Sequence, residues 1–176
     1  NNYFVANRVI WLTDDIEWPI VTDVLKRLAF ADDKTGDPIW LFIGSCGGLC
    51  DAGMALVDMI ERLKKKKVVV NTVCVGSCSS MAAVILASGT KGHRYAYPSS
   101  RIMIHQARMM MAGGSYDEMQ NEANELRYWT ETIAKSFAKV SGKPIKEIEK
   151  AMSYDNYMSA QDAKKFGLVD KVEAVI

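Results

Sequence analysis

Apolar runs of strand length alternate along the chain with segments in which apolar residues recur every three or four positions. The strand-like runs lie at residues 8–12, 38–43, 68–75 and 101–105. The helical segments lie at residues 20–31, 51–65, 80–87, 115–142 and 159–167. Strands and helices that alternate in this order are typical of a mostly parallel sheet with crossover helices, so the predicted fold class is α/β.

The longest helical segment carries its own start and stop signals. Ser115 and Glu118 form a capping-box pattern at its start, and Gly142 with Pro144 marks its end. Apolar residues that recur at helical spacing in this and two earlier segments are Val21, Val24, Leu25, Leu28 and Ala29; Met54, Val57, Met59 or Ile60, and Leu63; and Met119, Ala123, Leu126, Ile133, Phe137 and Val140. The run 68–75 is nearly all apolar, as expected for a strand covered on both faces.

Composition narrows the class of protein. The chain has 176 residues, enough for one ordinary domain, and 49% of them are hydrophobic, which excludes a disordered chain. Its 22 Lys and Arg against 21 Asp and Glu leave a net charge of +1, so we expect neither nucleic acid nor a membrane as partner. The only strong charge run, Lys64–Lys67, favours a solvated helix end over a nucleic-acid patch.

Four cysteines form two C-x-x-x-C pairs, Cys46 with Cys50 and Cys74 with Cys78. Four thiolates are a zinc ligand set, but paired ligands of structural zinc are usually two residues apart, so we expect no metal. Cys74 lies within an apolar run and is predicted to be a small buried hydrophobe. Reduced thiols and a first segment without the pattern of a signal peptide predict an intracellular protein.

Three features stand where strands give way to helices, the edge of an α/β sheet at which sites form. Ser80 opens an apolar helix and is either a helix cap or a nucleophile, with the Met81 N–H beside it as an oxyanion donor. His105 follows a strand and is the one plausible general base, because His93 lies in a polar stretch that predicts a solvated loop. The turn at residues 44–48 is glycine-rich and allows close approach of backbone N–H groups.

A carboxylate that would orient the histidine is not identified by these arguments. There are 21 acidic residues, and the order of triad members varies freely between folds. Residue chemistry therefore predicts a Ser/His hydrolase on an α/β sheet and leaves the acid open.

Several motifs, in order along the chain, resemble the proteolytic subunit of the Clp-type ATP-dependent protease. They lie at residues 43–48, 76–81, 87–94, 103–106, 154–160 and 163–170. The resemblance extends over residues 8–172 and implies a spiral of ββα units shared with the crotonases, with a protruding helical handle at about 106–142. It also implies one domain over residues 1–176.

The resemblance implies a catalytic triad of Ser80, His105 and Asp155. Ser80 would attack the peptide carbonyl, His105 would take and return the proton, and Asp155 would orient the imidazole. This residue-by-residue transfer supplies the carboxylate that chemistry alone left open.

The resemblance also implies how substrate is held. The backbone N–H groups of Gly48 and Met81 would form the oxyanion hole. Extended substrate would be bound by Gly48, Leu49, Arg108 and Met109, largely through backbone hydrogen bonds that ignore sequence.

For the assembly, the resemblance implies two stacked heptameric rings, fed with unfolded proteins by an AAA+ unfoldase. The chain would need no cofactor or metal, because ATP is used by the unfoldase. A cytoplasmic location is expected, with an organelle matrix or stroma as the alternative.

Several positions depart from the family pattern, and three of them concern the site or the contacts between rings. Cys46 and Ala107 replace prolines, and Tyr154 replaces an arginine that contributes to contacts between rings. A partner-dependent paralogue within a mixed ring is therefore an alternative to a homo-oligomer. A crotonase-type enzyme acting on CoA thioesters is a second alternative.

Overall fold

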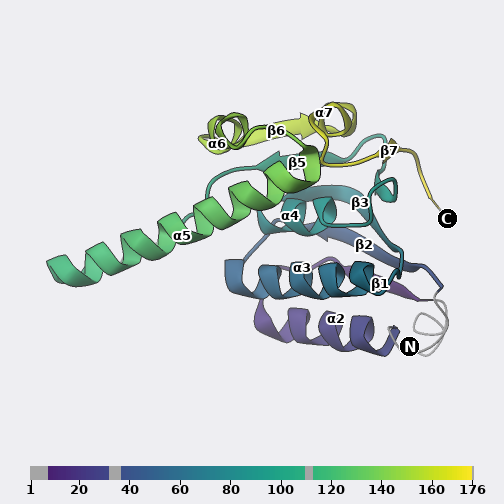
Figure 1. Cartoon of the computed structure of the whole chain (residues 1–176), viewed down its shortest axis with the longest axis horizontal. Helices are drawn as coiled ribbons and strands as arrows, with labels where there is room; N and C mark the ends of the chain where they lie inside the picture. Colours follow the sequence, from purple (N-terminus) through teal and green to yellow (C-terminus); the bar gives the residue numbers. More distant parts are fainter. Residues whose placement is uncertain (1–7, 32–36, 110–112, 176) are drawn as a thin grey trace.

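The structure is a computed structural model that describes residues 8–31, 37–109 and 113–175. Its strands are β1 (Val9–Leu12), β2 (Ile39–Ser45), β3 (Val70–Ser79), β4 (Arg94–Ala96), β5 (Arg101–Ile104), β6 (Asn156–Ser159) and β7 (Lys171–Val172). Its helices are α2 (Trp18–Ala31), α3 (Cys50–Lys65), α4 (Met81–Ala87), α5 (Tyr116–Ser141), α6 (Ile145–Met152) and α7 (Ala160–Phe166). Helix α5 projects from a compact body that holds the other elements (Figure 1).

The strands form one sheet that forks at β3. The main path runs β1-β2-β3-β4-β7, with all of its strands parallel. The first half of β3, residues 72–74, pairs with β4, whereas residues 77–79 pair with β5 in parallel. Strand β6 then adds to β5 in antiparallel orientation. The predicted α/β fold with a mostly parallel sheet is confirmed.

Gly76 lets β3 bend, so that its first part pairs with β4 and its last part pairs with β5. Its φ is +75°, and nothing lies within 4 Å of the place where a Cβ would stand. The predicted strand at 68–75 ends at this glycine, and that end was wrong, because β3 continues through the bend to Ser79. Gly76 redirects the strand toward β5 without ending its pairing.

The other differences from the predicted elements involve short segments. The three-residue strand β4 was not predicted, and neither α6 nor β6 was expected between the long helix and Ser159. Strand β4 pairs with β3, and β6 pairs with β5, so each short strand depends on a partner that is distant in sequence. Such short segments carry too little periodicity to be identified alone.

The main core lies between the sheet and helices α2, α3 and α4, which pack successively against one another (Figure 1). All seven residues of α4 are buried, which explains its uninterrupted apolar sequence. In α2 the predicted Val21, Val24 and Leu28 are buried, but Ala29 is exposed and Ala31 takes its place. Cys74 is fully buried, as predicted.

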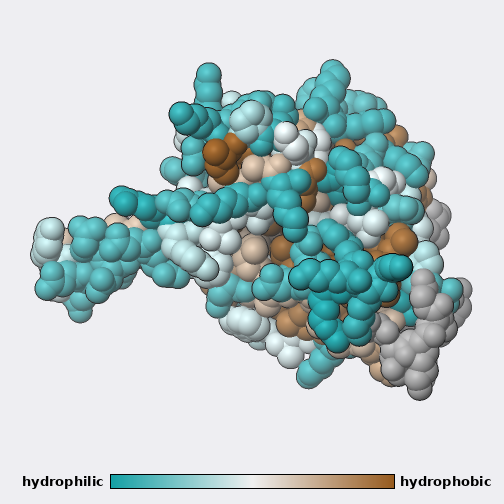
Figure 2. All heavy atoms as spheres, in the orientation of Figure 1, coloured by the Kyte–Doolittle hydropathy of each residue, from teal (hydrophilic) through white to brown (hydrophobic). Residues whose placement is uncertain are grey.

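Helix α5 has the predicted caps. The Ser115 hydroxyl accepts from the Glu118 N–H, the Glu118 carboxylate accepts from the Ser115 N–H, and Gly142 ends the helix with a φ of 74°. Its contact with the body begins at Leu126, which packs against the main core, and its second half holds the buried Ile133 and Phe137. The projecting half is largely hydrophilic on the face visible in Figure 2. Large apolar or aromatic side chains that α5 leaves exposed are Tyr116, Met119 and Tyr128.

Two charged or titratable groups are less solvated than predicted. His93 is half-buried, and its Nδ1 lies 3.0 Å from Oδ1 of the buried Asn71. Lys64 is half-buried and donates to the Ser88 carbonyl at 2.8 Å, whereas Lys65–Lys67 are exposed. Both side chains therefore have structural partners. Within the described residues no helix has the length and apolarity that a membrane crossing requires.

Candidate active site

Ser80 lies in the tight turn between β3 and α4. Its φ of 56° and ψ of −126° are unusual for a residue other than glycine and cost about 1–3 kcal/mol. The turn is held because the Ser80 N–H donates to the Met103 carbonyl at 2.9 Å, and because α4 is fully buried behind it. The strained backbone places the Ser80 hydroxyl at the edge of the sheet, next to the end of β5.

The strand registers bring His105 and Asp155 to the same place. Ser79 pairs with Met103, so the residues that follow the two parallel strands, Ser80 and His105, lie at neighbouring strand ends. On the other side, Ile104 pairs with Asn156 in antiparallel register, so His105 stands opposite Asp155. These two registers assemble residues that are 25 and 50 positions apart in sequence.

The three side chains form a continuous chain of hydrogen bonds. His105 Nε2 lies 2.9 Å from Ser80 Oγ, and His105 Nδ1 lies 2.9 Å from Asp155 Oδ1. An ionised carboxylate only accepts hydrogen bonds, so Nδ1 carries the proton of the neutral imidazole. Nε2 is then the acceptor for the Ser80 hydroxyl, which is the arrangement of a base beside its nucleophile.

The glycine-rich loop is packed against Ser80. Gly48 forms an isolated parallel bridge with Ile16, in which the Ile16 N–H donates to the Gly47 carbonyl and the Leu49 N–H donates to the Ile16 carbonyl, both at 2.8 Å. A Cβ on Gly47 would lie 2.7 Å from Ser80 Cβ. The predicted need for close backbone approach at this turn is therefore met.

The N–H groups of Gly48 and Met81 are unused in the described part of the chain. In a parallel bridge the hydrogen bonds come from the residues on either side of Gly48, so its own N–H points away from Ile16. Met81 is the first residue of α4 and has no preceding helical turn to bond. Both groups remain available as donors.

The predicted substrate-binding positions are partly exposed. Leu49 and Met109 have 48% and 41% of their surface accessible. The Leu49 backbone is already engaged, because its N–H bonds Ile16 and its carbonyl accepts from Gly53. Only the side chain of Leu49 is therefore available to contact a substrate.

Arg108 takes a place that the sequence did not indicate. Its Nη2 lies 2.5 Å from Asp155 Oδ1, the oxygen that His105 also contacts. The only feature of the sequence that could have indicated this contact is a long cationic side chain three residues after His105.

The four cysteines are free thiols at different depths. Cys46 is exposed, Cys50 is half-buried, and Cys74 and Cys78 are buried. Burial raises the pKa of Cys78, which keeps its thiol protonated at neutral pH. The described residues contain no group of three or more His, Cys, Asp and Glu side chains arranged to hold a metal ion.

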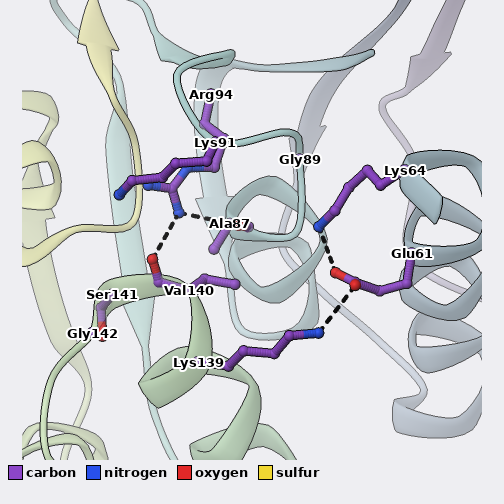
Figure 3. A pocket seen from close by; sticks show the side chains of 10 residues that line it. All are labelled: Glu61, Lys64, Ala87, Gly89, Lys91, Arg94, Lys139, Val140, Ser141 and Gly142. Atoms are coloured by element: carbon purple, nitrogen blue, oxygen red, sulfur yellow. Dashed lines mark hydrogen bonds and ion pairs between the residues drawn. The ribbon is translucent and has the colours of Figure 1, made fainter. Parts of the chain in front are cut away.

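A cavity of about 370 Å³ lies away from this site, where the C-terminal ends of α3, α4 and α5 meet (Figure 3). It is lined by four cationic side chains, but these are paired. Lys64 and Lys139 both contact Glu61, and Lys91 and Arg94 both contact Asp170. Arg94 also donates to the carbonyls of Ala87 and Val140. These cations compensate the helix ends and join α5 to the body, so the cavity is structural.

The sequence matches the family model of the Clp protease over residues 1–175. This chain belongs to the Clp protease family. Clp protease membership makes the chain a peptidase, and it confirms the resemblance expected from the motifs. It also removes the basis for the alternative of a CoA-thioester enzyme.

Relatives with the same family name cover nearly the whole chain. The ATP-dependent Clp protease proteolytic subunit 3 of Synechococcus sp. (strain CC9605) and subunit 2 of Prochlorococcus marinus (strain NATL2A) are each 36% identical over 168 residues, covering 95% of this chain and 82% of the relative. The chloroplastic subunit 3 of Arabidopsis thaliana is 37% identical over 172 residues, covering 97% of this chain and 54% of the relative.

Proposed function

We propose that the chain is a serine endopeptidase that hydrolyses peptide bonds of unfolded proteins with broad specificity. The observation that carries this proposal is the chain of two 2.9 Å hydrogen bonds linking Ser80, His105 and Asp155. Family membership as a peptidase supports the same chemistry.

In the proposed mechanism Ser80 Oγ attacks the peptide carbonyl while His105 Nε2 takes the hydroxyl proton. Asp155 accepts the hydrogen bond from Nδ1 and stabilises the imidazolium that forms. The imidazolium then returns the proton to the leaving amine, and a water molecule hydrolyses the acyl-enzyme by the same steps. The first transfer uses a hydrogen bond, between Ser80 Oγ and His105 Nε2, that is already formed in the free enzyme.

The developing oxyanion would be held by the N–H groups of Gly48 and Met81. Both belong to backbone segments packed against Ser80, so the donors need no rearrangement as charge develops. Removing one such donor typically costs about 3–4 kcal/mol of barrier stabilisation.

Broad specificity would follow from binding the substrate mainly by its backbone. The proposed contacts come from Gly48, Arg108 and Met109, with the exposed Leu49 side chain beside them. Hydrogen bonds to an extended peptide backbone do not depend on the substrate side chains.

We further propose an oligomer of two stacked heptameric rings that receives unfolded chains from an ATPase unfoldase. The projecting half of α5, with Met119 and Tyr128 exposed, supplies a face for contacts between rings. Relatives are named ATP-dependent proteolytic subunits, and the ATP would be used by the partner and not by this chain. A cytoplasmic or stromal location is proposed, the latter because one relative is named chloroplastic.

A mixed ring is the second candidate for the assembly. Relatives carry the subunit numbers 2 and 3, which indicates that organisms with such chains hold several paralogues. In that assembly the active site of this chain would work only when a different, paralogous subunit is present in the ring.

The test combines a serine-reactive fluorophosphonate probe with native mass measurement. Wild-type protein should be labelled at Ser80, should cleave a fluorogenic peptide and should assemble into one large species, whereas Ser80→Ala should assemble but neither label nor cleave. An assembled wild type that resists the probe would contradict the peptidase mechanism. A wild type that assembles and is labelled only after addition of a paralogous subunit would favour the mixed ring.

A further inference from the structure

Two side chains, His105 and Arg108, contact the same carboxylate oxygen, Asp155 Oδ1. His105 Nδ1 lies 2.9 Å from this oxygen and Arg108 Nη2 lies 2.5 Å from it. The His105 side chain is 12% exposed, Asp155 is 36% exposed and Arg108 is 61% exposed. The guanidinium therefore covers the solvent side of the carboxylate, while the imidazole lies on its inner side.

The backbone around Arg108 holds this side chain near Asp155. The Gln106 N–H donates to the carbonyl of Met152 at the end of α6, and the Ala107 side chain is buried. These contacts tie the segment after β5 to the element that precedes Asp155. Arg108 is thus directed at the carboxylate by an anchored backbone and not by its own side chain alone.

The positive charge of Arg108 opposes the stabilisation of the His105 imidazolium by Asp155. A carboxylate beside an imidazole stabilises the imidazolium, and a guanidinium on the same oxygen reduces that stabilisation. The packed elements β5 and α6 carry three further cations, Arg101, Lys146 and Lys150, and none of them contacts His105 or Asp155 in the described structure. Arg108 is therefore the cation whose contact bears directly on the pair.

We propose that Arg108 is a positioning residue that fixes the Asp155 carboxylate and limits how strongly it stabilises the protonated form of His105. The inference rests on the proposed function, because it assigns Arg108 a part in the Ser80–His105–Asp155 reaction. It makes the exposed loop after β5 a determinant of the pH range in which the peptidase works.

The direction of the effect follows from the protonation states. Ser80 is activated by neutral imidazole, so activity rises as pH increases through the titration of His105. Without the guanidinium, Asp155 stabilises the imidazolium more strongly, and neutral imidazole forms at higher pH. Removing the charge of Arg108 therefore moves the acid limb of the pH profile upward.

The test uses two variants of Arg108 and one of Lys150. In Arg108→Met the acid limb of kcat/KM should move to higher pH by about half to one unit, and the shift should shrink in high salt. Arg108→Lys keeps the charge, so its acid limb should stay at the wild-type pH, whatever the change in the height of the profile. Lys150→Met removes a cation of α6, the helix whose Met152 carbonyl accepts from Gln106, that lacks the contact, and should leave the limb in place. A shift as large in Lys150→Met as in Arg108→Met would overturn the role of the contact.

A second readout does not require turnover. The chain has only two histidines, so the ring carbon resonances of ¹³C-labelled protein can be assigned with a His93→Gln variant. The titration midpoint of His105 should move upward in Arg108→Met, in assembled protein of unchanged native mass. Equal midpoints would overturn the inference even in an active enzyme, whereas a shifted midpoint in a protein that resists the serine probe would count against the proposed function alone.

Discussion

Gly48 and Ile16 are joined by two 2.8 Å hydrogen bonds that run on either side of Gly48 and leave its own N–H directed away from Ile16. The backbone of Ile16 occupies the space in which a Gly48 side chain would begin. This bridge fixes the loop beside Ser80, so a small change at Gly48 is expected to act on the chemistry.

Gly48→Ala should lower kcat about 10²–10³-fold, because its Cβ would displace the loop and the proposed oxyanion donor. The measurement is kcat for a fluorogenic peptide in protein of wild-type native mass. Gly92→Ala is the matched control: its φ is also positive, at +84°, but its surroundings are open. It should lose about 1 kcal/mol of stability and keep its activity. Near-normal kcat in Gly48→Ala would exclude the Gly48 N–H as an oxyanion donor.

Asp155→Asn should lower kcat by about 10⁴-fold, because an amide that donates to Nδ1 leaves Nε2 protonated and unable to accept the Ser80 proton. Single-turnover labelling of Ser80 by the probe should slow in parallel. Asp58→Asn, at an exposed position of α3, should label at the wild-type rate. Equal labelling rates in the two variants would show that Asp155 does not orient the base.

Ser80→Gly should be more stable than Ser80→Ala by about 1 kcal/mol, although both lack the nucleophile. The backbone at Ser80, with φ of 56° and ψ of −126°, suits glycine and strains alanine, and this relief exceeds the extra flexibility of glycine in the unfolded chain. Thermal unfolding at matched protein concentration measures the difference. The reverse order of stability would mean that the turn carries no strain.

Asp170→Asn should destabilise the protein by about 3–5 kcal/mol, because it leaves the guanidinium of Arg94 buried without its carboxylate. Arg94 is 1% exposed and donates to both Asp170 oxygens, at 2.7 and 2.8 Å. Lys91→Met removes an exposed partner at 3.5 Å and should change stability by less than about 0.5 kcal/mol. Chemical or thermal unfolding of both variants at neutral pH compares the two costs.

The same pair predicts how stability depends on pH. Burial alone would raise the pKa of Asp170, but the hydrogen bonds and charge of Arg94, with the Gly92 N–H and Lys91, lower it to about 2. A carboxylate with a lowered pKa in the folded state stabilises the protein above its unfolded pKa near 4. That contribution, about 2 kcal/mol, is lost as pH falls from 4 through 2. Unfolding midpoints between pH 5 and 2 should fall less steeply in Asp170→Asn than in wild type.

Local sequence patterns were sufficient to predict most of the helices and strands. The caps of α5, the apolar face of α2 at Val21, Val24 and Leu28, and the buried helix after Ser80 follow from residues that are close in sequence. The positions of Ser80 and His105 at strand ends follow for the same reason, since strand and helix periods change at those residues. Parallel strands place their carboxyl ends at one edge, which made a shared site predictable.

The acid of the site required more than local pattern. Any of 21 acidic residues was available, and the choice of Asp155 depends on the register of β5 with β6, a short strand that the sequence did not reveal. The resemblance to a known family supplied Asp155 before the register was known. Residue chemistry alone had no means to select it.

What the amino-acid order established was an α/β chain with a serine and a histidine that each follow a strand, because helix and strand periods and cap residues act within a few positions. Tertiary structure alone decided the bend of β3 at Gly76, the direction of the Gly48 N–H and the sharing of Asp155 Oδ1 between His105 and Arg108. These depend on strand registers and packed backbones that join residues up to 50 positions apart, and hydrogen bonds at 2.5–2.9 Å tolerate no error in such registers.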